Sequence, residues 1–326
     1  MDELKPQRNI SKALIPLLLL CLVLVSTPSL GGEVFALETA SLPGVAVTGD
    51  FVVGPAKIEI LANPGEEKTA EFNVTNRTGR EHRFTLTVVD FEGSNSLSEQ
   101  AVTILENVKG KRSLKDLITL PQAEFTLSHG ERAIIPITLN IPADELPGGK
   151  FAAVMVSMLP AGEVSATNVG AEVISRIGVL LFTTVTGDFR QEGILLSVKT
   201  KNNQRLFWKP TVPIQLFFEN TGDTHLNPYG AVVVKNMLGA TSQTLELEPW
   251  FVLPDSTRAR EVLFEKSSLF GWYKVSAQIN RGYEDIVDEV TTSFFVLPLR
   301  EILLAFLVAT IFFIVRRCNK KVNVND

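Results

Sequence analysis

Three histidines are the side chains of this sequence that could most readily bind a metal ion: His82, His129 and His225. His225 follows Asp223 in the stretch FENTGDTHLNPYG, residues 218–230, and imidazole and carboxylate are both common zinc ligands. None of the histidines, however, lies in H-E-x-x-H or another spacing typical of a metal site. We therefore predict no metal, no cofactor and no catalytic residue here.

The same stretch is rich in residues that favour turns. Asn220 and Gly222 are typical of one turn, with Gly222 supplying a positive φ, and Asn227, Pro228 and Gly230 are typical of a second turn. An apolar run precedes the stretch, and AVVVKN follows it. We interpret residues 218–230 as a loop between two strands, with a ligand-contacting loop as the alternative.

Acidic pairs could support hydrolysis by two carboxylates. They are Glu66 with Glu67, Asp144 with Glu145, and Glu284 with Asp285. A charged pair at a β-turn is usually solvated, so a surface hydrolase is only our third hypothesis. The sequence also contains no G-x-S-x-G elbow and no G-x-x-x-x-G-K-[ST] phosphate loop. We predict that the protein is not an enzyme.

Composition excludes another class of function. The chain has 326 residues, 45% of them hydrophobic and 21% charged, with a formal net charge of −5. These values are ordinary for globular domains. The chain has no basic cluster except near its end, and therefore no nucleic-acid partner is expected.

The first residues predict export. Lys5, Arg8 and Lys12 precede the apolar run ALIPLLLLCLVLVS, and VFA at 34–36 fits a cleavage site. We predict a signal peptide over 1–36, cleaved after Ala36, with an uncleaved anchor as the alternative. Both cysteines, Cys21 and Cys318, lie outside the exported part, which therefore does not depend on disulfides.

The last residues predict a membrane anchor. Residues 302–315 form an apolar run of 14 residues, about 21 Å of helix, and a start at Pro298 lengthens it to about 27 Å. RRCNKK follows, which places that side in the cytoplasm. We predict a transmembrane helix over 298–315, a cytoplasmic basic tail over 316–326 and a single-pass type I protein of the cell membrane. A buried core helix is the alternative.

Between the two ends the hydrophobic pattern has a period of two. KTAEFNVTN, RAIIPITLNI, KFAAVMVSML and WYKVSAQIN alternate apolar with polar residues and are separated by turn-forming residues. Ile137 and Tyr273 fall on the apolar faces. The pattern predicts an all-β protein made of sandwiches.

Three short motifs recur in the same order. FNVTNRTG at 72–79 is echoed by LFFENTG at 216–222, LSHGERA at 127–133 by LPDSTRA at 253–259, and GKF at 149–151 by GWY at 271–273. The repeat predicts two tandem copies of one Ig-like β-sandwich. We place the first at 37–186 and the second at 187–297.

The segments NPGEEKTAEFNVTNRTG, LITLPQAEFTLSHGERAIIPITLNIPADELPGGKFAAVMV and FFENTGDTHLNPYGAVVVKNMLG resemble the Ig-like domains of the WxL-interacting cell-surface proteins of Gram-positive bacteria. The resemblance covers nearly the whole exported part. It implies a surface scaffold whose domains contact peptidoglycan, WxL-domain proteins or host ligands.

Together these observations favour a non-catalytic, membrane-anchored scaffold or adhesion protein that binds other surface proteins or a cell-wall polymer. The alternative is an extracytoplasmic chaperone or assembly factor that accepts a strand from a client. Possible partner-binding residues are His225, Tyr229 and Trp272; Trp272 points away from the face of Tyr273 and is the best surface candidate.

Overall fold

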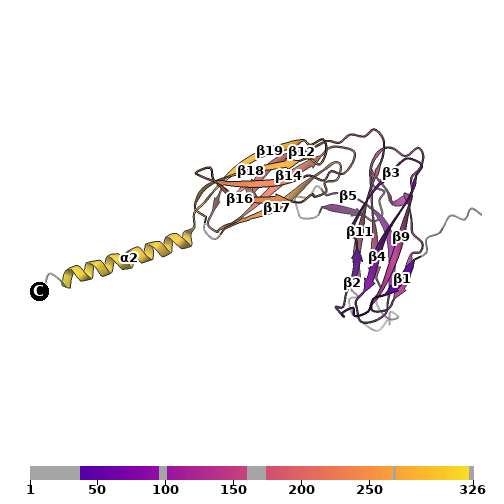
Figure 1. Ribbon diagram of the computed structural model, residues 1–326, viewed down its shortest axis with the longest axis horizontal. Coiled ribbons are helices and arrows are strands. Elements are labelled where there is room, and N and C mark those ends of the chain that lie inside the picture. The colour runs from indigo at the N-terminus through magenta and orange to yellow at the C-terminus, as the bar shows by residue number, and fades with distance from the viewer. Residues whose placement is uncertain (1–36, 95–100, 160–173, 267–268, 323–326) are drawn as a thin grey trace, which may run out of the picture. The chain divides into compact units, whose positions relative to one another are not determined.

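Alternating sequence patterns form strands throughout the computed structural model, which describes residues 37–94, 101–159, 174–266 and 269–322. The predicted signal peptide and its cleavage site lie outside these residues. Figure 1 shows the strands and the helix that follows them toward the C-terminus. The prediction of an all-β protein is confirmed.

The first half contains these elements: β1 Glu38–Ser41, β2 Phe51–Gly54, β3 Lys57–Ala62, β4 Glu67–Asn76, β5 His82–Gly93, β6 Val102–Leu105, a 3-10 turn Lys115–Leu117, β7 Ile118–Thr119, β8 Glu124–Leu127, β9 Glu131–Asn140, β10 Gly148–Met158 and β11 Ser175–Val185. The second half contains β12 Gly193–Thr200, a 3-10 turn Lys201–Asn203, β13 Leu206–Phe207, β14 Thr211–Asn220, β15 Tyr229–Asn236, β16 Thr241–Leu247, β17 Ser256–Glu265, β18 Gly271–Asn280, β19 Val287–Val296 and α2 Leu299–Val322.

The strands form four sheets, two from the first half of the chain and two from the second. Two sheets, with the orders β1-β9-β4-β2 and β3-β11-β10-β5-β6, use only strands that precede residue 186. The other two, β12-β14-β17 and β13-β19-β18-β15-β16, use only strands that follow residue 192. Each pair encloses its own apolar core, which contains Ile137 in the first half and Tyr273 in the second, as predicted.

A third apolar cluster lies on the outer face of the sheet β3-β11-β10-β5-β6. Phe91, Phe151 and Phe182 of that sheet pack there with Leu253, and Phe251 packs against them. Leu253 and Phe251 belong to the second half of the chain. Residues from Leu37 onward accordingly form a single compact unit, and independent folding of the two halves remains a prediction.

The chain passes from one sheet to the other between β2 and β3, and this passage determines how much of the β11 edge is covered. β2 is antiparallel to β4 in one sheet, and the chain then crosses at Pro55 and Ala56 so that β3 runs parallel to β11 in the other sheet. β3 pairs only with Leu180–Val185 of β11. The first five residues of β11 have β10 on one side and, among the described residues, no strand on the other.

The sequence repeat is visible in two buried asparagines. Asn76 ends β4 and donates from its Nδ2 to the carbonyls of Arg80 and Leu127, at 2.8 Å each. Asn220 ends β14 and donates in the same way to the carbonyls of Thr224 and Val252, also at 2.8 Å each. In both cases the Oδ1 accepts the N–H two residues later. The echo of NRTG and NTG therefore preserves one turn-fixing hydrogen-bond pattern.

The prediction of a membrane-spanning helix over 298–315 is wrong. The helix α2 has 24 residues, but no helix in the described parts of the chain is long and apolar enough to cross a membrane. Charged residues interrupt it, because Arg300 and Glu301 precede its apolar run of 14 residues and Arg316 follows. About 21 Å of apolar helix is short of the ~30 Å of a bilayer core. The same finding contradicts the predicted localisation as a single-pass type I membrane protein.

Asn76→Ala should lower the free energy of unfolding by about 2 kcal/mol or more, because the buried carbonyl of Leu127 and the partly buried carbonyl of Arg80 lose their donor. The measurement is chemical denaturation followed by far-UV circular dichroism. Asn73→Ala is the matched control on the same strand, since its side chain is only half-buried, and it should change stability by much less. Equal effects of the two substitutions would contradict a turn-fixing role for Asn76.

Candidate functional site

The stretch 218–230 consists of the end of β14, a loop, and the start of β15. The loop is a structural turn, as predicted, since Asn220 fixes it from within. The second half of the chain also uses it to contact the first half. This contact was not foreseen from the sequence.

Gly222 is required for a different reason from the one predicted. Its φ is not among the positive values. Instead, a Cβ at this position would lie 2.8 Å from both the carbonyl oxygen of Arg190 and the backbone nitrogen of Glu192. The loop accepts this close approach because its amides bond to the 190–192 segment: the N–H of Gly222 donates to the carbonyl of Glu192, at 3.0 Å, and that of Asp223 to Arg190, at 2.7 Å.

Asp223 joins the loop to the first half of the chain. Its carbonyl accepts the N–H of Gly149 at 2.8 Å and the guanidinium of Arg112 at 2.9 Å. Its carboxylate accepts the N–H of Arg190 at 3.1 Å and a second bond from Arg112 at 3.1 Å. The N–H of Arg190, and then Arg112, lower the pKa of Asp223, so that its carboxylate stays ionised and bonded to these two residues.

His225 lies mostly buried between the two halves, with 10% of its side chain exposed. Its ring packs edge-on against Phe182, with centroids 4.9 Å apart, and against Phe151. Nε2 is 3.3 Å from Oε1 of Glu59 on β3, and Nδ1 has no hydrogen-bond partner among the described residues. The imidazole is therefore part of an aromatic junction rather than a partner-binding surface.

The charges around His225 oppose one another. Burial lowers its pKa, Glu59 raises it and Lys57 lowers it, and the net effect is a lowered pKa. Burial raises the pKa of Glu59, but the hydrogen bond and charge of Lys57, together with His225 and Asn227, bring it below its usual value. Burial at the junction thus disfavours the protonated form of His225.

The other two histidines also have structural contacts. Nδ1 of His82 is 3.2 Å from the carbonyl of Leu159, and Nε2 of His129 is 3.1 Å from the carbonyl of Val45. No group of three or more His, Cys, Asp or Glu side chains gathers as a metal site in the described residues.

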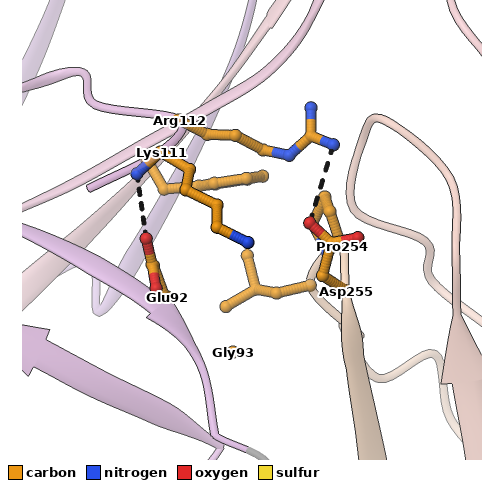
Figure 2. A pocket seen from close by; sticks show the side chains of 8 residues that line it. Glu92, Gly93, Lys111, Arg112, Pro254 and Asp255 are labelled. Atoms are coloured by element: carbon orange, nitrogen blue, oxygen red, sulfur yellow. Dashed lines mark hydrogen bonds and ion pairs between the residues drawn. The ribbon is translucent and has the colours of Figure 1, made fainter.

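A small pocket of about 130 Å³ lies beside this junction. It is lined by Glu92, Gly93, Lys111, Arg112, Phe151, Leu253, Pro254 and Asp255. Figure 2 shows the Lys111 side chain extending into it and Arg112 facing Asp255, with the two charged groups 4.0 Å apart. The lining has two cations and two carboxylates but no hydroxyl, thiol or imidazole side chain, so it offers no side-chain nucleophile of those types.

The acidic pairs lie in or beside turns at three separate places in the chain. Glu66 pairs with Lys68 and Glu145 with Lys150. Glu284 and Asp285 form a turn and both have φ of 51°. Glu66 and Glu145 are thus held by ion pairs, Glu67 begins β4, and Glu284 and Asp285 lie in a turn.

The open half of β11 is the feature that sequence reasoning missed. The N–H of Leu180 donates to the carbonyl of Ala56, at 3.0 Å, and that of Thr186 to Ala62, at 2.9 Å. Even-numbered residues of β11 therefore turn their backbone groups toward the β3 side, since strand residues alternate in direction. Arg176 and Gly178 then present N–H and C=O groups at the part of the edge that β3 leaves uncovered.

This open half of β11 has few charged side chains. Arg176 is its one charged residue and forms an ion pair with Glu106. Ile174 and Ile177 are exposed. By contrast β17, at the edge of the sheet β12-β14-β17, carries Arg258, Arg260, Glu261 and Glu265, and charges on edge strands discourage pairing with another chain.

The remaining candidate residues lie in the second half. Trp272 is 54% exposed and contacts Phe295, with ring centroids 5.3 Å apart, and Phe270 is exposed beside them. Tyr229 is 42% exposed at the start of β15. Tyr229 pairs with Asn280 at the end of β18, whereas Trp272 lies at the start of that strand. With His225 in the junction, the structure does not bring the three residues into one site.

Comparisons with known proteins give no family. No family model matches the sequence, and no curated protein matches it significantly.

Solved structures similar to this chain include three bacterial chaperones. One is the CsuC–CsuE chaperone–tip adhesion subunit pre-assembly complex of Acinetobacter baumannii (14% identity, 74% of this chain and 98% of that one, TM-score 0.37). Another is the E. coli chaperone DraB (11% identity, 76% of this chain and 96% of that one, TM-score 0.34). The third is the CupB2 chaperone of Pseudomonas aeruginosa (12% identity, 75% of this chain and 100% of that one, TM-score 0.33). At these scores the likenesses carry no argument about function. None of the three is a WxL-interacting protein, and that resemblance remains an expectation.

Gly222→Val should destabilise the protein by about 2 kcal/mol, because the side chain would overlap main-chain atoms that cannot move independently. Thermal unfolding measures the loss. Thr221→Val, at the exposed neighbouring position, is the control and should have a small effect. Unchanged stability of the glycine variant would show that the loop is not fixed against residues 190–192.

Stability should fall as the pH falls below about 6.5. The pKa of His225 is lowered on folding from 6.5, so the unfolded chain binds a proton that the folded chain does not, and the stability present above pH 6.5 is lost in acid. His225→Phe should flatten the slope between about pH 7 and pH 5, as measured by urea denaturation at each pH. His129→Phe, away from the junction, should retain the slope; a steep slope in the His225 variant would contradict this assignment.

Proposed function

We propose that this protein is a non-catalytic binding protein that accepts an extended strand of a client protein, in a chaperone or assembly role, at the open half of β11. The observation that carries the proposal is the pair of outward-facing backbone groups of Arg176 and Gly178, in line with the part of the edge that β3 already covers. Main-chain hydrogen bonds supply affinity in this mode of recognition, and alternate side chains supply specificity.

The chemistry of the edge supports such a partner. Ile177 points toward the inner core side, as Val179 does, and is 37% exposed. An added strand would cover it and would bond to the backbone groups of Arg176 and Gly178, which have no partner among the described residues. The predicted signal peptide would carry the chain out of the cytoplasm to meet a client there.

A second candidate function is a surface scaffold that binds other proteins or a wall polymer. One observation favours it: the exposed aromatic side chains of Phe270 and Trp272 beside Phe295. Aromatic side chains of this kind are enriched at binding surfaces. Trp272→Ala should weaken such binding, whereas strand acceptance at β11 should be unaffected.

Gly178→Pro should abolish client binding, because proline removes the N–H at the open edge. The proline should not disturb the pairing of β10 with β11, because β10 bonds to the odd-numbered residues of β11. The client would be captured from source-cell extracts by the full chain, and hydrogen exchange would then be measured on the purified complex. Binding should slow the exchange of the Arg176 and Gly178 amides in the wild type.

Gly178→Ala is the matched control, because both substitutions add a Cβ but alanine retains the N–H. In that variant the client should still protect the Arg176 amide. The Leu180 amide, already bonded to Ala56, reports that the edge is folded in every variant. Undiminished binding by the proline variant would exclude this edge as the client site.

A further inference from the structure

Met155 lies across from Gly178 on the neighbouring strand β10. Both residues are on the outer face of the sheet, where Met155 packs at the margin of the third apolar cluster. A Cβ at Gly178 would lie 2.8 Å from Sδ of Met155. The thioether therefore lies over the glycine, between β10 and the open edge, in space that any other residue at position 178 would fill.

This arrangement explains why a glycine stands inside a strand. Glycine in a strand interior weakens it and often marks a close approach by another group. Here the approaching group is the Met155 side chain, which reaches over β11 because no Cβ blocks it. A strand added at the edge would lie about 4.8 Å from β11, so that one of its outward side chains would stand beside Gly178.

The geometry points to an aromatic residue at that position of the client strand, packed over Gly178 against the Met155 thioether. Sulfur contacts with aromatic rings are favourable at about 5 Å, and an aromatic residue beside an edge glycine covers the backbone that glycine exposes. This inference rests on the proposed strand acceptance and names the chemical class of the client segment.

The neighbouring positions complete the pattern. Ile177, on the opposite face, is exposed and next to buried Val179. The client residues adjacent to the aromatic one would therefore point inward and be apolar. Arg176 is on the outer face and is paired with Glu106, so a second outward residue of the client needs no charge. The expected segment alternates, with inward apolar residues and one outward aromatic residue.

Synthetic peptides test this inference with the full-length protein. Each peptide has about ten residues that alternate valine and threonine, and carries a single phenylalanine at one of the threonine positions in turn. Peptides with alanine or cyclohexylalanine at the same position are the matched controls. Binding is measured from the amide NMR signals of Arg176 and Gly178 during titration, which detects weak affinities.

We expect one position at which phenylalanine binds about threefold to tenfold more tightly than alanine, and more tightly than cyclohexylalanine. Met155→Leu keeps the volume but removes the sulfur, and Gly178→Ala displaces the thioether. Both variants should lose the preference for phenylalanine over cyclohexylalanine and still bind the alanine peptide as the wild type does. An intact Leu180 amide signal shows that the variants are folded.

Two other results would overturn the inference, and they differ. If peptides shift the Arg176 and Gly178 signals without any aromatic preference, or if the preference survives in both variants, the Met155 contact is wrong and strand acceptance stands. If no peptide of any series shifts these signals, the edge does not accept strands, and the proposed function fails together with the inference.

Discussion

The main-chain carbonyl of Asp223 is the acceptor on which the arrangement of this protein depends. It binds the N–H of Gly149 and the guanidinium of Arg112, so one oxygen from the second half holds two groups from the first. The carboxylate of the same residue is bonded to Arg190 and Arg112. Around this polar centre Phe151, Phe182 and Phe251 pack together with His225. The aromatic contacts bury apolar surface, and the hydrogen bonds determine which residues of the two halves meet there.

The contact between the two halves at this junction leaves the first residues of β11 available for pairing with another strand. The outer face near Phe182 is covered by the second half, whereas residues 175–179, at the other end of the same strand, remain uncovered among the described residues. The edge at residues 175–179 is open because the pairing of β3 with β11 begins only at Leu180. One strand thus serves two purposes along its length, with structural contacts at its end and exposed backbone groups at its start.

Local patterns in the sequence predicted the strands well because alternation is a property of neighbouring residues. Ile137 and Tyr273 are buried and Trp272 is exposed, as the period of two required. The Asn and Gly of the 218–230 loop likewise indicated a turn. The predicted positive φ of Gly222 was wrong, because the constraint is the approach of residues 190–192, which no local pattern reveals.

Contacts between distant residues escaped prediction for the same reason. The place of His225 depends on Glu59, Phe151 and Phe182, which come from three different strands. The open edge depends on the register between β3 and β11. Two weak signals were present in the sequence: Gly-Pro between two alternating runs, and Gly178 inside a third. The helix at the end was overestimated because an apolar run of 14 residues was extended across Arg300 and Glu301.

The aromatic side chains of the two cores differ in a way that affects how the protein can be observed. All three tryptophans, Trp208, Trp250 and Trp272, and all three tyrosines, Tyr229, Tyr273 and Tyr283, lie after residue 192, whereas the core of the first half uses phenylalanine. Tryptophan emission therefore reports only on the second half. Trp250 is buried and Trp272 exposed, so a change in emission records the opening of that half, while loss of the β11 edge would pass without any optical signal from tryptophan.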